Sequence, residues 1–490
     1  MVSPSQPRAS LQQLGSVMAL AIVLALAFWL GSSLVSPSRE VVLVVVAALV
    51  AVCLLRPAIG LALVAVAVPF GETVPWVQVT IGPLDGGLGE ILLGFVLLGW
   101  LARVAARRDR IISDPLVWPI AAFLGAEMLS AAFAPPLAES AKELMRWVEV
   151  IAIYLATISL VRKPGASRLV LGAIFAAGAG QALIGGYQFL TADGPRAFQI
   201  DRFLRAYGSF GQPNPYAGYL EMVVPLGLAL VFVWRPARRD WLWWLALAAA
   251  LLGCGAILLS LSRGAWLGMA VGITAAAAVA TQRGRLVAAG IVPAAAFLWL
   301  VDRVGLLPAA ISERVSQATL ILSLFDARGV VPTAADFSVV ERMAHWQAGW
   351  EMFLSHPLLG VGPGHYAIAY PQYAILPYWT AALGHAHNIY INVAAEDGVI
   401  GLIAYLVMVG SWLVFALRRA RGLAVKEPTS LRTAVVIGVL GCLTAVAVHN
   451  IFDDLYVHMM NVQIGMLLGL ASVAGPALGV AAREPSAPAS

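Results

Sequence analysis

The sequence predicts an all-α protein, a polytopic bundle of transmembrane helices with one large loop outside the membrane. Three observations support this prediction. First, 60% of the 490 residues are hydrophobic and only 12% are charged, about half the charged fraction of a typical soluble chain. Second, continuous apolar runs of roughly 15 to 22 residues, long enough to cross a bilayer, recur along the chain. Third, basic residues are distributed unevenly between the loops that would alternate across a membrane.

The apolar runs correspond to about 12 to 14 spans. Fourteen candidate spans can be placed, at residues 14–35, 40–55, 57–70, 88–104, 116–134, 148–161, 169–191, 216–234, 241–261, 264–280, 286–302, 388–417, 433–449 and 456–480. The first run is too long for the apolar core of a signal peptide and is followed by a poor cleavage site. We therefore expect it to be a span.

The arginine and lysine residues predict the orientation of the chain. If the N-terminus is cytoplasmic and the loops alternate, cytoplasmic segments hold 20 of the 31 Lys and Arg residues, as expected for a protein of the plasma membrane. Both termini are then cytoplasmic and the large loop is extracytoplasmic. The net charge of +5 is spread over short loops, which argues against a nucleic acid as partner.

The chain is predicted to divide into four segments. They are an N-terminal transmembrane bundle at 1–302, an extracytoplasmic loop region at 303–386, C-terminal transmembrane helices at 387–480 and a disordered tail at 481–490. Within the loop region, apolar residues recur at steps of three and four between Val339 and Phe353, which predicts an amphipathic helix at 338–355. The three cysteines lie in apolar runs, so we expect no disulfide framework.

The histidines gather in one part of the chain. All seven lie between His345 and His458, on or close to the predicted outer side. His387 stands at the edge of a predicted span, where an ionisable group is costly to keep. Three interpretations of His387 stay open from the residues alone: a buried hydrogen-bonded side chain, a proton relay in a transporter, or a general base.

Arginines on the predicted outer side are exceptions to the charge distribution. Arg205, Arg263 and Arg342 are candidates to bind a pyrophosphate, because guanidinium groups form paired, charge-assisted hydrogen bonds with phosphate oxygens. Their positive charge would keep a nearby imidazole unprotonated, and that imidazole could accept a proton from an attacking hydroxyl. The arginines could also carry the charge of the leaving group, so this chemistry needs no metal.

Three other motifs have simpler interpretations. Residues 360–364 are rich in glycine but lack the Gly-Lys-Ser/Thr of a nucleotide-binding loop. His385 and His387 have no Asp, Glu or Cys nearby at ligand spacing, so we expect no metal site. Asp453 and Asp454 form a second polar cluster with His449 and His458, and we expect this cluster to line the last outer turn.

Four blocks of the chain resemble the O-antigen ligase and polymerase superfamily of bacterial membrane glycosyltransferases. The blocks begin at Arg205, Leu261, Arg342 and His387 and end at Leu220, Gly268, Gly364 and Gly401. They follow one another in the family's order, and the large outer loop lies where the family has it. Family members mostly carry fewer than fourteen spans. Either the first two spans are an extension, or one span has been counted twice.

The resemblance implies an enzyme that transfers a glycan from an undecaprenyl-pyrophosphate-linked donor to a lipid or glycan acceptor, on the outer face of the plasma membrane. It implies that His387 is the general base. The residues that it implies at the donor pyrophosphate are Arg205, Arg263 and Arg342. The residues that we expect to orient the histidine or the sugar are Asn214, Asn388, Tyr390 and Glu396. No cofactor is expected.

Other functions stay open. A polymerase of the same superfamily would use a second lipid-linked repeat unit as acceptor, and sequence pattern scarcely separates it from a ligase. A transporter or lipid flippase could use the outer histidines and Glu221 as proton-coupling groups. Against it, the basic and imidazole groups gather on one face rather than near the bilayer midplane, and no inverted repeat is visible. A non-catalytic scaffold would leave the outer arginines unexplained.

Overall fold

The computed structural model describes residues 39–473 except for 72–78, 82–83, 113, 163–164, 201–202, 237–239, 283, 287–289, 291–299, 302–303, 306–324 and 334–335. The predicted span at 14–35, most of the one at 286–302 and the predicted tail at 481–490 lie outside the described residues.

The described chain is almost entirely helical, which confirms the predicted all-α class. Its helices are α2 (Arg39–Leu55), α3 (Pro57–Phe70), α4 (Leu88–Ala105), α5 (Val117–Ala131), α6 (Leu137–Leu160), α7 (Ala166–Thr191), α8 (Pro213–Glu221), α9 (Val224–Val233), α10 (Trp241–Leu259), α11 (Arg263–Ala280), α14 (Phe337–Ser355), α15 (Tyr366–Tyr373), α16 (Ile389–Lys426), α17 (Leu431–His449) and α18 (Met460–Val473). A short 3-10 helix, η2 (Arg196–Phe198), precedes one of two small antiparallel hairpins. The strands of these hairpins are β1 (Val79–Ile81), β2 (Leu84–Gly86), β3 (Gln199–Ile200) and β4 (Phe203–Leu204).

The helices agree with the predicted spans. Twelve of the fourteen predicted spans coincide with a described helix or pair of helices, and the other two are those at 14–35 and 286–302. Seven helical segments are long and apolar enough to cross a membrane: α4, α7, α8 with α9, α10, α11, α16 and α17. Four shorter apolar helices, α2, α3, α5 and α18, accompany them. The chain is a multi-pass membrane protein.

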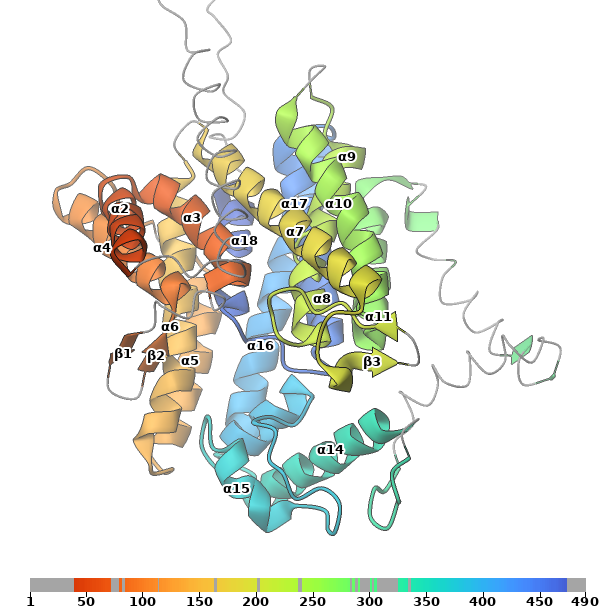
Figure 1. The fold of residues 1–490 in the computed structure, drawn as a ribbon. Helices are drawn as coiled ribbons and strands as arrows, with labels where there is room; N and C mark the ends of the chain where they lie inside the picture. Colours follow the sequence, from red (N-terminus) through yellow and green to blue (C-terminus); the bar gives the residue numbers. More distant parts are fainter. Residues whose placement is uncertain are drawn as a thin grey trace, which may run out of the picture.

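Helices from both predicted transmembrane segments pack into one bundle. In Figure 1, α2, α3 and α4 lie on one side and α7, α9, α10, α11 and α17 on the other, with α16 and α18 between them. α17 packs against α9 and α11, and α18 packs against α6. Helices on either side of residues 302 and 387 pack together. This packing does not test the predicted division of the chain at these residues, which stays a prediction.

Hydrogen bonds between loops show which helix ends meet. At one end of the bundle, Asn214 of α8 contacts Asp453, which follows α17, at 2.7 Å. At the other end, Arg168 of α7 contacts Asp240, which precedes α10, at 2.7 Å. The predicted outer ends of these helices therefore meet at one end of the bundle and the predicted inner ends at the other. Which end faces the cytoplasm stays a prediction.

The predicted helix at 338–355 is present as α14 and covers one end of the bundle with α15 (Figure 1). It contacts the first turns of α16. Val339 and Met343 of the predicted apolar stripe are buried, while Trp350 is 49% exposed. The helix ends at Ser355, two residues before Pro357, because a residue that precedes proline disfavours the helical conformation.

Candidate active site

The start of α16 places His387. Asn388 is the N-cap of this helix, and its Oδ1 accepts hydrogen bonds from the backbone N–H groups of Tyr390 at 2.9 Å and Ile391 at 3.1 Å. His387 precedes it with φ of 52°, a left-handed conformation that is uncommon for residues with a side chain. The carbonyl oxygen of His387 accepts a hydrogen bond from Nε1 of Trp346 on α14 at 3.2 Å. His387 is therefore held between α14 and α16.

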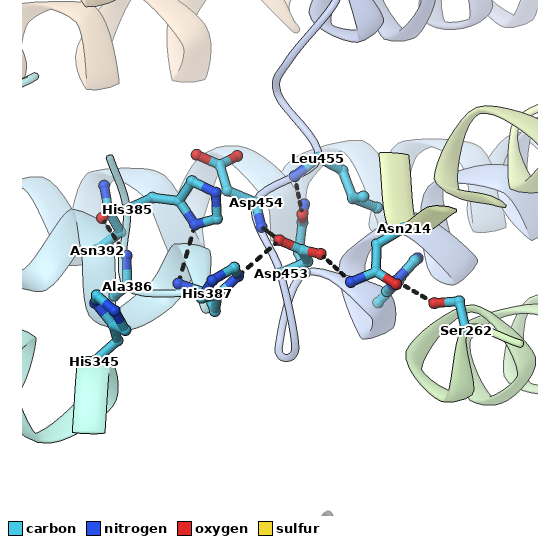
Figure 2. Close-up of polar contacts among 12 residues, drawn as sticks. Asn214, Ser262, His345, His385, Ala386, His387, Asn392, Asp453, Asp454 and Leu455 are labelled. Atoms are coloured by element: carbon cyan, nitrogen blue, oxygen red, sulfur yellow. Dashed lines mark hydrogen bonds and ion pairs between the residues drawn. The ribbon is translucent and has the colours of Figure 1, made fainter. Parts of the chain in front are cut away.

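His387 faces a carboxylate from a distant part of the chain. Its Nδ1 lies 3.3 Å from Oδ1 of Asp453, which stands in the loop between α17 and α18 (Figure 2). The other oxygen of Asp453 accepts a hydrogen bond from Nδ2 of Asn214 at 2.7 Å. Its Oδ1 also accepts one from the backbone N–H of Asp454 at 2.9 Å. Asp453 is only 4% exposed, so this buried carboxylate connects α8 with the residue before α16.

The surroundings keep Asp453 ionised. Burial by itself would raise the pKa of this carboxyl, but the hydrogen bond with His387 and the charges of His387, His385 and Arg342 lower the pKa below its ordinary value. An ionised Asp453 favours a proton on Nδ1 of His387, which leaves Nε2 as the acceptor of the neutral ring. Nε2 is buried and has no hydrogen-bond partner within the described residues. A nitrogen in this state can accept a proton from a substrate.

Two further histidines lie beside His387. Nδ1 of His385 accepts a hydrogen bond from the backbone N–H of His387 at 3.0 Å, and the two ring centroids are 4.5 Å apart. The ring of His345 on α14 lies 5.8 Å from that of His387. Burial lowers the pKa of His345 to about 3, and the charges of His387 and His385 act in the same direction. Burial also lowers the pKa of His385, so both neighbours are neutral near pH 7.

Arg205 is joined to the same network. Its Nε donates to the carbonyl oxygen of Ser260 at 2.8 Å, and its Nη2 donates to Oδ1 of Asn214 at 3.0 Å. Asn214 therefore links Arg205 to Asp453. Burial lowers the pKa of Arg205, and together with the positive charges of Arg342 and Arg263 it brings the pKa to about 10. The three guanidinium groups thus lie close enough to repel one another.

Arg263 and Arg342 reach this region from two other helices. Arg263 is the first residue of α11, and Arg342 is on α14. Nε of Arg342 is buried, with no hydrogen-bond partner in the part of the chain that the structure describes. None of the three arginines forms an ion pair with a carboxylate of the described residues. A cluster of cations in this state can bind an anion such as a pyrophosphate.

The remaining predicted residues have partners that hold α16. The cap hydrogen bonds occupy Oδ1 of Asn388. The hydroxyl of Tyr390 donates to the carbonyl oxygen of Ala447 on α17 at 2.7 Å. Glu396 accepts hydrogen bonds from the backbone N–H of Tyr366 at 2.7 Å and from Nδ2 of Asn392 at 3.0 Å. The structure thus gathers His387, Asn214 and the three arginines, and it engages these other three residues in packing.

Sequence reasoning missed the part that Asp453 plays. We expected Asp453 to line the last outer turn together with Asp454, His449 and His458. Its contacts with His387, 66 residues away, and with Asn214 of α8 distinguish it from its neighbours. His449 instead pairs with Glu221, with Nδ1 and Oε2 2.9 Å apart. The sequence did offer one indication of this contact, because Asp453 and Asp454 were predicted to lie on the same side of the membrane as His387.

His385, His387 and Asp453 are also the residues best placed to hold a metal ion. Their potential ligand atoms lie within 4.8 Å of one another. Spacing along the sequence indicated no carboxylate near the two histidines, because Asp453 comes from another segment. Three protein ligands and an open position suit a catalytic zinc ion. The fit is poor, however, because both oxygens of Asp453 accept hydrogen bonds and Nδ1 of His387 faces Asp453 directly.

Fold and site together define a class: a multi-pass helical membrane protein with a buried imidazole–carboxylate pair beside three clustered arginines. A family model described as O-antigen ligase matches residues 248–406, a range that includes Arg263, Arg342 and His387. This match covers about a third of the chain and supports the resemblance to the O-antigen ligase and polymerase superfamily seen in the sequence. The family consists of glycosyltransferase-like ligases and polymerases, so the match supports an enzyme of the membrane. No curated protein matches it.

Proposed function

We propose that this enzyme transfers a glycan from an undecaprenyl-pyrophosphate donor to a hydroxyl group of a lipid or glycan acceptor, on the outer face of the plasma membrane. The observation that supports this most is the connected series Arg205, Asn214, Asp453 and His387, with contacts of 3.0, 2.7 and 3.3 Å. It joins groups suited to binding a pyrophosphate to a group suited to accepting a proton.

His387 acts as the general base of this reaction. Asp453 holds the proton on Nδ1, so Nε2 accepts the proton of the acceptor hydroxyl. The hydroxyl oxygen bonds to the anomeric carbon as the bond from that carbon to the pyrophosphate oxygen breaks. Attack on the face opposite the leaving group inverts the anomeric configuration. No metal is required at any step.

The three arginines bind the donor pyrophosphate and stabilise the charge that it gains. Undecaprenyl pyrophosphate leaves with the bonding electrons, and fixed positive charges in a buried site lower the energy of that transition state. Arg205 already has its guanidinium oriented by Ser260 and Asn214. α14, which carries Arg342, lies over the donor site, so its mobility governs donor entry. Asn388, Tyr390 and Glu396 orient His387 indirectly, through the start of α16.

The experiment is reconstitution of the purified protein in liposomes with an undecaprenyl-pyrophosphate-linked glycan and a set of lipid-linked and soluble glycan acceptors. The expected result is a glycosylated acceptor, released undecaprenyl pyrophosphate and an inverted anomeric centre in the product. A lipid-linked repeat unit as the preferred acceptor would make the enzyme a polymerase, and another lipid would make it a ligase. Movement of the donor lipid across the bilayer without any product would instead support a flippase.

A further inference from the structure

A second polar cavity lies beside the candidate active site. It has a volume of about 310 Å³ and is walled by α5, α6, α15, the first turns of α16 and the segment that precedes α18. Glu139 and Lys142, at one end, have side chains that are 38% and 40% exposed. Glu127 and Asp397, elsewhere in its wall, are 4% and 2% exposed. The cavity thus reaches from the outer edge of α6 to buried carboxylates.

His385 separates this cavity from the catalytic pair. It lines the cavity, and its Nδ1 contacts the backbone N–H of His387 at 3.0 Å. In Figure 2, His387 and Asp453 lie between His385 on one side and Asn214, the partner of Arg205, on the other. None of the three clustered arginines lines the cavity. The imidazole–carboxylate pair is therefore bordered by an arginine cluster and by a separate acidic cavity.

The cavity contains more hydrogen-bond acceptors than the protein satisfies. Oε2 of Glu127 and Oδ1 of Asp397 are buried and have no partner among the described residues. Glu143 is paired with Arg146 at 2.7 Å and Glu139 with Lys142 at 3.1 Å, so these cations are already engaged. Buried carboxylate oxygens without donors are unfavourable. A ligand that donates hydrogen bonds would supply the missing partners.

The spacing of the carboxylates favours an extended ligand over a single ion. Within the described chain, the only group of three or more His, Cys, Asp and Glu side chains close enough to share one ion is His385, His387 and Asp453. Trp147 and Tyr456 also line the cavity, which adds aromatic surface to the acidic groups. A sugar ring matches both features, because it carries hydroxyl donors around its edge and C–H groups on its faces. The cavity volume lies at the small end of ligand sites, which span about 300–1,000 Å³.

We propose that this cavity binds the terminal sugar of the acceptor through hydroxyl or amino groups that donate to Glu127 and Asp397. This inference rests on the proposed function. It adds the site at which the acceptor binds and the class of sugar that this site accepts. The sugar is neutral or amino-substituted, since an acidic sugar would meet these carboxylates. Its reactive hydroxyl extends past His385 to His387, while the donor pyrophosphate occupies the arginine cluster.

The test measures binding of a candidate acceptor glycan by isothermal titration calorimetry to the full-length protein in detergent, with no donor present. Glu127→Gln and Asp397→Asn are expected to weaken binding roughly five- to tenfold each, because each amide offers one acceptor oxygen where the carboxyl group has two. Ala367→Phe leaves every carboxylate in place but fills the cavity, and it should weaken binding as well. Glu149→Gln is the matched control, because Glu149 is on α6, is bonded to Asn461 at 3.2 Å and does not line the cavity.

Two comparisons separate this inference from the proposed function. His387→Ala should transfer no glycan but keep most of the acceptor affinity, because the contacts with Glu127 and Asp397 remain. The uronic acid form of the same sugar should bind wild type about tenfold more weakly than the neutral form. Unchanged binding in Glu127→Gln, Asp397→Asn and Ala367→Phe, with normal transfer by wild type, would overturn the cavity assignment and leave the proposed function intact. Wild type that neither binds nor glycosylates any glycan would overturn both.

Discussion

Nδ1 of His387 lies 3.3 Å from Oδ1 of Asp453, although the two residues are 66 positions apart in the sequence. The contact connects the residue before α16 to the loop after α17. It fixes the imidazole by its Nδ1 side, so the buried Nε2 is the ring nitrogen left without a partner among the described residues. The geometry is that of an imidazole whose tautomer is set by a carboxylate.

Asp453→Asn should lower kcat by roughly 10²- to 10⁴-fold, because an amide no longer stabilises the proton on Nδ1 and the ring adopts the wrong tautomer. KM for the donor should change much less. Initial rates of glycan transfer in liposomes measure both quantities. Glu149→Gln serves as a control for the loss of a half-buried carboxylate elsewhere. A kcat within twofold of wild type in Asp453→Asn would contradict the orienting role.

His387→Ala should abolish transfer while the protein remains in the membrane at normal abundance. The variant removes the proton acceptor, and no other described side chain replaces Nε2, since burial lowers the pKa of both neighbouring histidines. His356→Ala is the matched control, because His356 is an exposed histidine of the same loop region. Full activity in His387→Ala would rule out the assignment of the base.

The helices were predictable because a membrane requires long apolar segments, and the described helices lie close to the predicted spans. The predicted span at 216–234 differs in detail. It forms two helices, α8 and α9, which are separated at Met222 and Val223. α8 thus ends at Glu221, whose carboxylate pairs with His449. Hydropathy alone does not register such a break, because both halves are apolar.

The candidate site was predictable only in part. Resemblance to a family identified His387 and the three arginines, and the fold brings them to one end of the bundle. Asp453 was not singled out, because no spacing rule connects residues in different loops. Asn388 shows the opposite case. We expected Asn388 to orient the histidine or the sugar. In the structure its Oδ1 instead caps α16.

Arg205→Lys should reduce kcat/KM for the donor about tenfold or more, although the charge is kept. The single ammonium nitrogen of a lysine does not reproduce the planar geometry in which two separate guanidinium nitrogens donate to Ser260 and Asn214, so we expect Asn214 to lose one of its two partners. Transfer rates at varied donor concentration measure the effect. Arg196→Lys, at an exposed arginine of the neighbouring segment, should behave as wild type. If kcat/KM for the donor in Arg205→Lys equals that of wild type, this result would count against pyrophosphate binding by Arg205.

Chelator should leave transfer unchanged if the arginines alone carry the leaving-group charge. The check is transfer by liposomes treated with EDTA, then dialysed, with and without added zinc or magnesium. Rates that stay constant through these steps support the metal-independent mechanism. Loss of activity on chelation that zinc restores would instead assign His385, His387 and Asp453 as a metal site.

Acid should destabilise the protein partly through His345. The pKa of this buried histidine is lowered to about 3 from an ordinary value of 6.5. Between these values the unfolded chain binds a proton that the folded chain does not, so stability is fully present above pH 6.5 and is lost as pH falls. By pH 5 the loss is up to about 2 kcal/mol.

His345→Asn removes this titration and should therefore show a smaller fall in apparent unfolding temperature between pH 8 and pH 5 than wild type. Asparagine can keep a hydrogen bond with the hydroxyl of Tyr366, which lies 3.3 Å from Nδ1 of His345. Some acid sensitivity should remain, because burial also lowers the pKa of His385. Thermal unfolding in detergent, followed by tryptophan fluorescence at both pH values, measures the difference. Equal falls in the two proteins would show that His345 is not responsible for the acid sensitivity, whereas a smaller fall in the variant assigns that part of it to the neutral, buried ring.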